Sequence, residues 1–439
     1  MRTLLYMLLA ATIASCSVSK QINKKAVTIL LQDSIIKTGH TGISIYEPAT
    51  NQYWYNYNAD KFFVPASNVK LFTLYAGMKC LGDSIVGARY ATSGNDLYIT
   101  PAADPTFLHP DFDNQPLVRL LQNKGNTIYV SPISDIPPLG YGWSWDDYDQ
   151  AYMTERNNFP VYGNTVWLST SALLPKKITR DTLLDTVKYM GNQWLYIKPK
   201  YFADKLLKAA SPAYLREKTK NIFYTDSVAK LETIPFLTNF DNTTHEILQQ
   251  ILNKPIKLGA IHKPYTTLFS QPTDSLFKPM MHRSDNFFAE QTLIMASNEK
   301  LGYFDDAAII DTLLSTALKD IPQKPKWVDG SGLSRYNLFT PTDFIYILNK
   351  LSSEFGVERL KNILPTGNTG TLKQYYVTDS GFIYAKTGTL SNHVALSGFV
   401  LTRKNKWLIF SVLNNNFTGR SSAVRRAVEK FIQELRNRY

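Results

Sequence analysis

A change in the residue pattern in the middle of the chain constrains the fold most. From about Ser84 to His262 the sequence consists of short strand patterns separated by loops rich in proline and aromatic residues, such as "ISDIPPLGYGWSWDDYD" and "FPVYGNTVWLS". Longer helical and strand patterns lie on both sides of this region. The chain has 439 residues, 44% of them hydrophobic, enough for about three globular domains of roughly 150 residues each. The middle region therefore predicts a separate, β-rich insertion.

The flanking patterns predict helices and antiparallel strands. Apolar residues at helical spacing predict a helix over residues 20–38, with Lys37 in its last turn and Gly39 in a left-handed C-terminal position. "GISIYEP" and "QYWYNYN" predict a β-hairpin, and "FVPASNVKLFTLYAGMKCLG" predicts a helix. Near the C-terminus "GFIYAKTGTL", "HVALSGFVLTR" and "KWLIFSVLNNN" predict three antiparallel strands, which a last helix follows.

The N-terminal segment has the pattern of an export signal. Arg2 precedes an apolar run, Leu4 to Ala14, that is too short to span a bilayer but has the length of a signal h-region. The ending Ile13-Ala14-Ser15-Cys16 resembles a bacterial lipobox and implies lipidation of Cys16; ordinary cleavage without a lipid is the alternative. We therefore expect residues 1–16 to be a lipoprotein signal peptide, and the mature protein to be periplasmic and lipid-anchored to a membrane of a bacterial envelope.

Cysteine content and charge limit the partners. After removal of the signal, Cys80 is the one cysteine besides Cys16, so we expect no internal disulfide and interpret Cys80 as a small buried hydrophobe. The net charge is +12, from 48 Lys and Arg against 36 Asp and Glu. In an exported protein this charge favours an anionic polymer or surface outside the cytoplasm over nucleic acid.

The motif S-x-x-K occurs repeatedly, and context distinguishes its copies. It begins at Ser17, Ser34, Ser67, Ser227, Ser275 and Ser297. Only Ser67 and Lys70 follow a strand pattern and a proline and lie in the first turn of an apolar helix. Residues at i and i+3 share a helix face, with Cβ atoms about 5–6 Å apart, so the Lys70 amine can reach the Ser67 hydroxyl. Ser34 and Lys37, where S-x-x-K is fused to a K-T-G, are interpreted as a helix terminus.

Two further motifs follow Ser67 in order. Ser284-Asp285-Asn286 precedes an amphipathic helix pattern, and Lys386-Thr387-Gly388 lies on a strand pattern. "SDN" could be a simple helix N-cap, because all three residue types are good caps. Ser93-Gly94-Asn95 also matches S-x-N but is interpreted as a turn in the insertion. Each motif is weak alone, whereas the order S-x-x-K, S-x-N, K-T-G in matching contexts is a strong signal.

Other peptidase and hydrolase signatures are absent from the sequence. The six histidines are scattered without H-x-x-x-H or H-E-x-x-H spacing, which argues against a zinc peptidase. No G-x-S-x-G motif occurs, which argues against a Ser-His-Asp hydrolase.

With these motifs the chain resembles the penicillin-binding, active-site-serine D,D-peptidases. It is most similar to their D-alanyl-D-alanine carboxypeptidase/endopeptidase branch (low-molecular-mass class C, type-4-like), which has a long insertion between the first two motifs. The similar segments are "SDNFFAE", "DGSGLSRYN", "LPTGNTGTL" and "KTGTLSNHVALSGFV". The insertion agrees less well, since Ala102 and Ala103 stand where glycines are usual. We interpret "DGSGLSRYN" as a structural turn near the site.

The resemblance implies the fold and the domain organisation. The fold is α+β: a penicillin-binding/β-lactamase-like transpeptidase domain, in which helices flank an antiparallel sheet, with a large β-rich insertion. Residues 17–84 and 263–439 would form the peptidase domain, and residues 85–262 would form the insertion.

The resemblance also implies catalytic roles. Ser67 is the nucleophile that forms an acyl-enzyme, Lys70 is its base, and Ser284 relays a proton toward the leaving amine. A serine hydroxyl needs a neutral amine to take its proton, and the ordinary lysine pKa is about 10.4. We therefore expect burial and the nearby Lys386 charge to lower the pKa of Lys70.

The binding roles that the resemblance implies lie on the second and third motifs. Asn286 holds the substrate amide and Lys70, while Lys386, Thr387 and Thr389 bind the terminal carboxylate. Gly388 leaves room for the substrate along the strand edge, and the backbone N–H groups of Ser67 and Thr389 form the oxyanion hole. The expected partners are peptidoglycan stem peptides, with β-lactams as covalent inhibitors, and no cofactor, metal or nucleic acid.

Two other functions stay open at this point. One is a β-lactamase or esterase on the same fold, which would need fast deacylation. The other is a noncatalytic, wall-binding lipoprotein with a decayed site, and covalent labelling by a fluorescent penicillin would distinguish it from a peptidase.

Overall fold

The computed structural model describes residues 18–132, 136–170, 186–190, 193–208, 215–225, 231–239, 242–259 and 265–439. Contacts divide the chain into two compact units. The first comprises Met1–Tyr75, Phe277–Asp285 and Ile310–Tyr439, and the second comprises Ala76–Leu276 and Asn286–Ile309. The domain boundaries expected from the sequence, at 84/85 and 262/263, stay a prediction.

The first unit is built on a five-stranded antiparallel sheet. Its strand order is β14-β15-β16-β1-β2, so β14 and β2 are the edges. The bounds are β1 His40–Glu47, β2 Gln52–Tyr57, β14 Ile383–Leu390, β15 His393–Leu401 and β16 Trp407–Asn415. The expected hairpin and the three expected C-terminal strands are confirmed. Pairing of β1 with β16 joins the two ends of the chain in one sheet.

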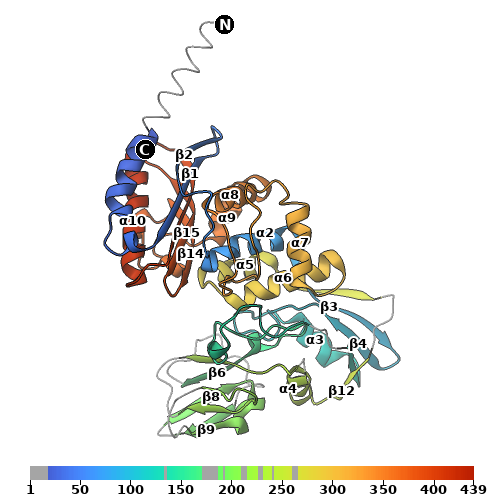
Figure 1. Ribbon diagram of the computed structural model, residues 1–439. Helices are drawn as coiled ribbons and strands as arrows, with labels where there is room; N and C mark the ends of the chain where they lie inside the picture. The colour runs from blue at the N-terminus through green and yellow to red at the C-terminus, as the bar shows by residue number, and fades with distance from the viewer. Residues whose placement is uncertain are drawn as a thin grey trace. The chain divides into compact units, whose positions relative to one another are not determined.

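Helices cover both faces of this sheet (Figure 1). On one face α10 (Ser421–Arg438) packs Val424, Val428 and Ile432 against strand residues such as Val394 and Phe410. The other face carries α8 (Pro341–Phe355), whose Pro341 lies under Gly42, and the 3₁₀ turn η3 (Ala66–Val69). Successive side chains of a strand point to opposite faces, so each strand contributes to both layers.

Local sequence fixes where these helices begin. Thr340 accepts a hydrogen bond from the Asp343 N–H while the Asp343 carboxylate accepts one from the Thr340 N–H, and Pro341 is the first helical residue of α8. The η3 turn continues directly into α2 (Lys70–Cys80). Cys80 is partly exposed, so its interpretation as a buried residue is wrong; it is the last residue of α2, where the helix reaches the surface.

The helix expected over residues 20–38 is wrong from residue 32 onward. Helical structure runs from residue 18 into the π-helical segment η1 (Val27–Leu31) and then ends. Ser34 lies in a turn, and Lys37 lies in a separate 3₁₀ segment, η2 (Ile36–Thr38). Gly39 is extended, with φ −118°, rather than left-handed. Glycine is required there because a Cβ would lie 2.3 Å from the Asn415 carbonyl oxygen.

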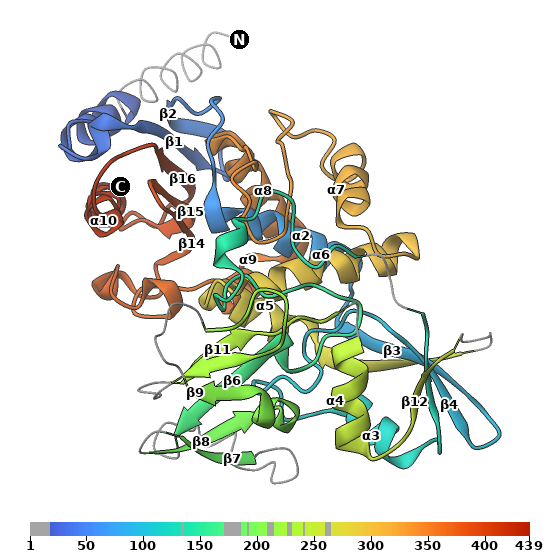
Figure 2. The same cartoon turned by 60° about the horizontal axis from the view of Figure 1, so that its bottom comes forward.

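The second unit is rich in β-structure, as the sequence predicts (Figure 2). One sheet has the order β12-β5-β4-β3-β13, a second has the order β11-β6-β8-β7, and β9 pairs with β10. The bounds are β3 Ser84–Ser93, β4 Asp96–Pro101, β5 Ile128–Val130, β6 Thr165–Thr170, β7 Thr186–Met190, β8 Gln193–Lys198, β9 Leu206–Lys208, β10 Phe223–Thr225, β11 Glu232–Pro235, β12 Ile256–Leu258 and β13 Thr266–Pro272. Gly94, with φ +55°, turns the chain between β3 and β4, so the turn expected at Ser93-Gly94-Asn95 is confirmed.

The remaining helices complete the described chain. Their bounds are α3 Pro116–Asn123, α4 Asn242–Leu252, α5 Thr273–His282, α6 Asn286–Leu301, α7 Asp306–Ser315 and α9 Val357–Ile363. In the second unit Leu117 of α3 and Ile247 of α4 belong to the same apolar core as Leu97 and Leu168. Among the described residues no helix is long and apolar enough to cross a bilayer.

Candidate active site

The Ser67 hydroxyl lies beside a buried amine. Ser67 is the second residue of η3, and Lys70, three residues later, is the first residue of α2. The Lys70 Nζ lies 3.0 Å from the Ser67 Oγ, and the Lys70 side chain is fully buried. The i and i+3 spacing in the first helical turn therefore places the amine within hydrogen-bonding distance of the hydroxyl, as the sequence predicts.

The segment "DGSGLSRYN" holds this amine in place. Lys70 Nζ donates a 2.6 Å hydrogen bond to the Ser331 carbonyl oxygen. The loop is organised by the buried Asp329 carboxylate, which accepts from the N–H groups of Gly332 (2.8 Å) and Ser334 (2.6 Å). The interpretation of this segment as a structural turn near the site is confirmed. The sequence did not predict that one of its carbonyl groups would hold Lys70.

Glycine at position 332 is required by the close approach of two backbones. Gly332 has φ +80°, and a Cβ on it would lie 1.9 Å from the Ala66 carbonyl oxygen and 3.0 Å from the Ser67 nitrogen. Ala66 itself has φ +48°. The loop therefore packs directly against the backbone of the serine that we expect to be the nucleophile.

Asn68 is a site residue that the sequence analysis missed. It lies between Ser67 and Lys70, is fully buried, and donates a 3.1 Å hydrogen bond to the Ser397 hydroxyl of β15. Ser397 in turn lies 2.9 Å from Ser411 of β16. The η3 turn is thus tied to the middle of the sheet. The sequence carries no signal for this contact beyond the alternation of small polar residues along these strands.

Ser284 and Lys386 form the second pair of the site. Ser284 lies between α5 and α6 with φ +59°, and its hydroxyl accepts a 2.9 Å hydrogen bond from the Lys386 Nζ. Lys386 also donates to the Thr387 carbonyl oxygen at 2.7 Å. Burial, together with the positive charge of Lys70, lowers the pKa of Lys386 well below its ordinary value of 10.5. In this buried site a positive charge on one lysine therefore lowers the pKa of the other.

Gly388 brings the edge of the sheet against the Ser67 turn. A Cβ at this position would lie 2.6 Å from the Pro65 carbonyl oxygen and 3.1 Å from the Ser67 nitrogen. A side chain would therefore push β14 away from Ser67. Thr387 and Thr389 alternate with Lys386 and Gly388 along β14 and so point to the opposite face.

Two expected site residues are not placed against Ser67. Asn286 is the first residue of α6 and directly follows Asp285; its side-chain amide donates a 2.9 Å hydrogen bond to the Tyr152 carbonyl oxygen, within the second unit. Its part in holding the substrate and Lys70 stays a prediction. Cys16, the expected lipidation site, lies outside the described residues.

The arrangement has the parts of a nucleophilic serine site that uses lysine in place of histidine. Ser67 can attack a carbonyl group, Lys70 can take its proton, and Ser284 with Lys386 offers a second proton route. Within the described parts of the chain, no group of three or more His, Cys, Asp or Glu side chains is arranged to hold a metal ion. Fold and site together define an active-site-serine acyl enzyme.

Comparison with known proteins places the chain within this class. Residues 23–193 and 253–439 match the model of the D-Ala-D-Ala carboxypeptidase 3 (S13) family. Because the match covers well over half of the chain, the protein belongs to this family. It is a serine-type D-Ala-D-Ala carboxypeptidase, and the family expected from the motifs is confirmed.

Individual relatives agree with the assignment. The chain is 23% identical to a D-alanyl-D-alanine carboxypeptidase from Actinomadura sp. (strain R39), over 90% of this chain and 81% of the relative. Its fold is similar to that of penicillin binding protein 4 from Haemophilus influenzae, with TM-score 0.71, 18% identity, and 95% and 99% of the two chains covered. A predatory peptidoglycan endopeptidase from Bdellovibrio bacteriovorus has TM-score 0.51 and 17% identity, over 90% of this chain and 92% of that one. The expected transpeptidase fold is therefore confirmed.

Proposed function

We propose that the protein hydrolyses the D-alanyl-D-alanine bond of peptidoglycan stem peptides through an acyl-enzyme on Ser67. The observation that carries this proposal is the 3.0 Å separation between the Ser67 hydroxyl and the fully buried Lys70 amine. The Ser331 carbonyl oxygen orients that amine by accepting one of its hydrogens. A neutral Lys70 then has its lone pair available for the Ser67 proton.

The first half of the reaction forms the acyl-enzyme. The Ser67 Oγ attacks the carbonyl carbon of the penultimate D-alanine while Lys70 takes the hydroxyl proton. The backbone N–H groups of Ser67 and Thr389 are the proposed donors to the resulting oxyanion, a contribution worth about 3–4 kcal/mol in a serine enzyme. The carbon–nitrogen bond then breaks, and the leaving D-alanine amine receives a proton from the Ser284 hydroxyl. Lys386, 2.9 Å from that hydroxyl, is placed to resupply it.

The second half releases the shortened peptide. Water attacks the Ser67 ester and gives one proton to the Ser284–Lys386 pair, which replaces the proton that went to the leaving amine. Lys70 returns its proton to the Ser67 Oγ as the ester bond breaks, and the peptide leaves with the remaining water hydroxyl as its new carboxyl group. A β-lactam would acylate the same oxygen by opening of its ring amide. Its amine stays tethered to the acyl group, so the adduct is expected to be long-lived and to label the protein covalently.

The proposed substrate contacts lie along the free edge of β14. An extended peptide can pair with an edge strand, and Gly388 leaves the space for it beside Ser67. The hydroxyls of Thr387 and Thr389 and the amine of Lys386 are the proposed partners of the terminal carboxylate. Asn286 is the proposed partner of the substrate amide.

The same contacts suit a cross-linked peptide, because its acceptor side carries a D-amino acid carboxylate next to the scissile amide. We therefore include D,D-endopeptidase activity in the proposal. The endopeptidase from Bdellovibrio, which shares the fold, supports this extension.

Substitution of Ser67 tests the proposal. Ser67→Ala should abolish labelling by a fluorescent penicillin and lower peptide hydrolysis by about 10⁴-fold, since no other group can form the acyl intermediate. Ser34→Ala is the matched control, because Ser34 begins the S-x-x-K that is fused to a K-T-G and lies in a turn. This variant should change neither labelling nor hydrolysis. Labelling that persists in Ser67→Ala contradicts the assignment. Labelling without peptide hydrolysis in the unaltered protein favours a β-lactamase, and neither activity favours a noncatalytic wall-binding protein.

We further propose that the protein is periplasmic and held to a membrane of the envelope by a lipid on Cys16. The lipobox-like ending of the N-terminal segment supports this proposal. Cys16→Ala should move the protein from the membrane pellet to the soluble periplasmic fraction. Recovery of the variant in the pellet after a salt wash contradicts the lipid anchor.

A further inference from the structure

Arg425 differs from the other arginines of α10 in having no acidic partner among the described residues. Arg426 pairs with Glu429 at 2.6 Å, Arg436 with Asp379 at 3.1 Å, and Arg438 with Glu434 at 3.3 Å. Within the described chain the hydrogen bond of the Arg425 side chain goes to a neutral group: its Nη2 donates to the Thr389 hydroxyl at 2.6 Å. Its guanidinium charge is therefore not neutralised by an ion pair with any described residue.

The hydroxyl that Arg425 contacts belongs to Thr389, the residue that follows Gly388, and Gly388 lies against the backbone of the reacting serine. The Thr389 oxygen accepts from Arg425, and no acceptor for its own proton occurs in the described part of the chain. The Thr387 hydroxyl, two residues earlier, likewise has no hydrogen bond there. Both hydroxyls can therefore donate to an incoming anion.

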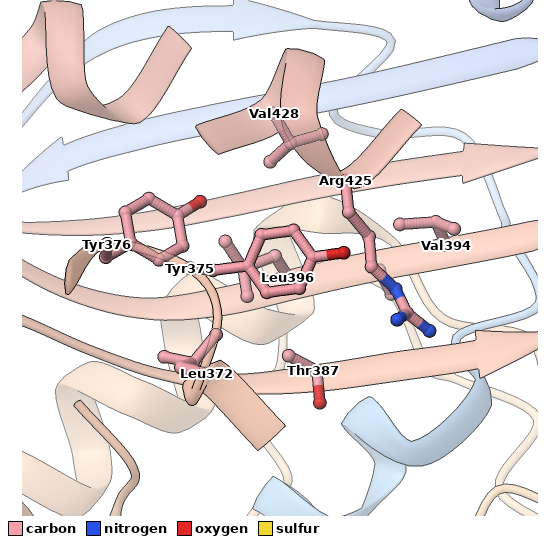
Figure 3. Close-up of a pocket in the computed structure, with 9 residues that line it drawn as sticks. Leu372, Tyr375, Tyr376, Thr387, Val394, Leu396, Arg425 and Val428 are labelled. Atoms are coloured by element: carbon pink, nitrogen blue, oxygen red, sulfur yellow. The ribbon is translucent and has the colours of Figure 1, made fainter. Parts of the chain in front are cut away.

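The guanidinium can be reached from solvent. Arg425 and Thr387 line a small pocket of about 20 Å³, room for about one water molecule, that opens to solvent on the α10 face of the sheet. Figure 3 shows the Arg425 side chain running from α10 toward β14, between Val394 and Leu396. The rest of the lining is apolar or aromatic, including Tyr375 and Val428. Arg425 is the cation among these lining residues.

Lys386, by contrast, is poorly suited to carry a lasting charge for the substrate. It is fully buried, and its hydrogen bonds in the described chain go to Ser284 and to the Thr387 carbonyl oxygen. Burial favours its neutral form by lowering its pKa. Arginine remains charged at any physiological pH and presents a planar set of donors that matches a carboxylate.

We propose that Arg425, together with the Thr389 hydroxyl, binds the terminal carboxylate of the peptide substrate and makes the enzyme selective for free-carboxylate ends. The inference rests on the proposed function of Ser67. Because β14 is an edge strand, a peptide paired along it lies beside side chains from both faces of the sheet. Arg425 can thus act from the α10 face while Ser67 attacks from the other face.

A matched pair of peptides tests the proposal. One ends in D-Ala-D-Ala with a free carboxylate, and the other is the same peptide with a C-terminal amide. Arg425→Gln removes the charge and keeps a hydrogen-bond donor, so kcat/KM for the carboxylate peptide should fall by about 30-fold or more, mainly through KM. For the amide peptide it should fall by less than about 3-fold. Arg425→Lys, which keeps the charge without the planar fork, should recover part of the preference.

Lys430→Gln is the control, because Lys430 is an exposed cation of the same helix; it should leave the preference for the carboxylate unchanged. An equal loss on both peptides in Arg425→Gln means that Arg425 only positions Thr389, and overturns the proposal. An unchanged ratio overturns it too. In either case covalent penicillin labelling of Ser67 would persist, so failure of this inference is distinguishable from failure of the proposed function.

Discussion

Replacement of Gly332 by alanine should displace the backbone of the Ser67 turn and so slow the reaction of Ser67. A Cβ at position 332 would lie 1.9 Å from the Ala66 carbonyl oxygen and 2.4 Å from its carbon, whereas real Cβ contacts below 3.0 Å are essentially never seen. To lengthen the contact from 1.9 Å to 3.0 Å, one of the two backbones must move by about 1 Å. The atoms involved are main-chain atoms on both sides of the contact, so no flexible side chain can absorb the shift.

The expected size of the effect follows from this displacement. The loop holds Lys70 through the Ser331 carbonyl oxygen, and Ser67 is the residue after Ala66. A shift of about 1 Å between a nucleophile and its base costs on the order of 100-fold in rate. The left-handed backbone at position 332, with φ +80°, adds about 1–2 kcal/mol of strain for any L-residue with a side chain.

Gly381→Ala is a control that has the backbone strain of Gly332→Ala without its contact with Ala66. Gly381 has φ +81°, and a Cβ there would meet nothing within 4 Å. Both variants should therefore show similar backbone strain as a lowered melting temperature, but only Gly332→Ala should lose about 100-fold in the rate of acylation by a fluorescent penicillin. If the two variants label at rates within about 3-fold of each other, the contact between the loop and the Ser67 turn does not hold the active geometry.

Two further predictions concern stability and pH. The pKa of Lys386 is lowered well below 10.5 by burial and by the Lys70 charge, so below pH 10.5 there is a window in which the unfolded state binds the extra proton and the free energy of unfolding rises with pH. Lys386→Met should reduce that rise in urea titrations at several pH values between about 7 and 10, and identical slopes would contradict the lowered pKa. Burial raises the pKa of Asp343 to about 6 from 3.8, so the folded state binds the extra proton and stability should fall as the pH rises from 3.8 to about 6. Asp343→Asn should lessen this fall, and an unchanged pH profile would show that the carboxyl group titrates normally.

The strands and the motif order were predictable because their signals are local. The short, mostly apolar runs of β14, β15 and β16 indicated strands, and they are mostly apolar because one face packs on α10 and the other on η3 and α8. The Lys70 position followed from helix geometry alone once Ser67 had been distinguished from Ser34 by the preceding strand and proline. The end of the first helix was wrong because Gly39 was interpreted as a left-handed cap. It is a contact glycine, and its partner, Asn415, lies at the far end of the sequence.

Contacts between distant segments account for what the sequence did not reveal. The hydrogen bonds from Lys70 to Ser331, from Asn68 to Ser397 and from Arg425 to Thr389 join residues separated by 261, 329 and 36 positions. None of these partners is marked by residue type, because a backbone carbonyl, a serine and a threonine occur everywhere. Only the tertiary fold brings them to the site.

The backbone conformation of the site opposes local preference at two of its central positions. Ala66, directly before Ser67, has φ +48°, and Ser284 has φ +59°; neither residue is glycine, and this region costs an ordinary L-residue about 1–2 kcal/mol. A sequence-based prediction follows the preferred conformation and therefore fails at such positions. The surrounding contacts must impose the strained conformation: the Gly332 backbone against Ala66, and the Lys386 amine on the Ser284 hydroxyl. Both strained residues direct a serine hydroxyl toward a lysine, so the strain is found where the proposed chemistry needs fixed proton donors and acceptors.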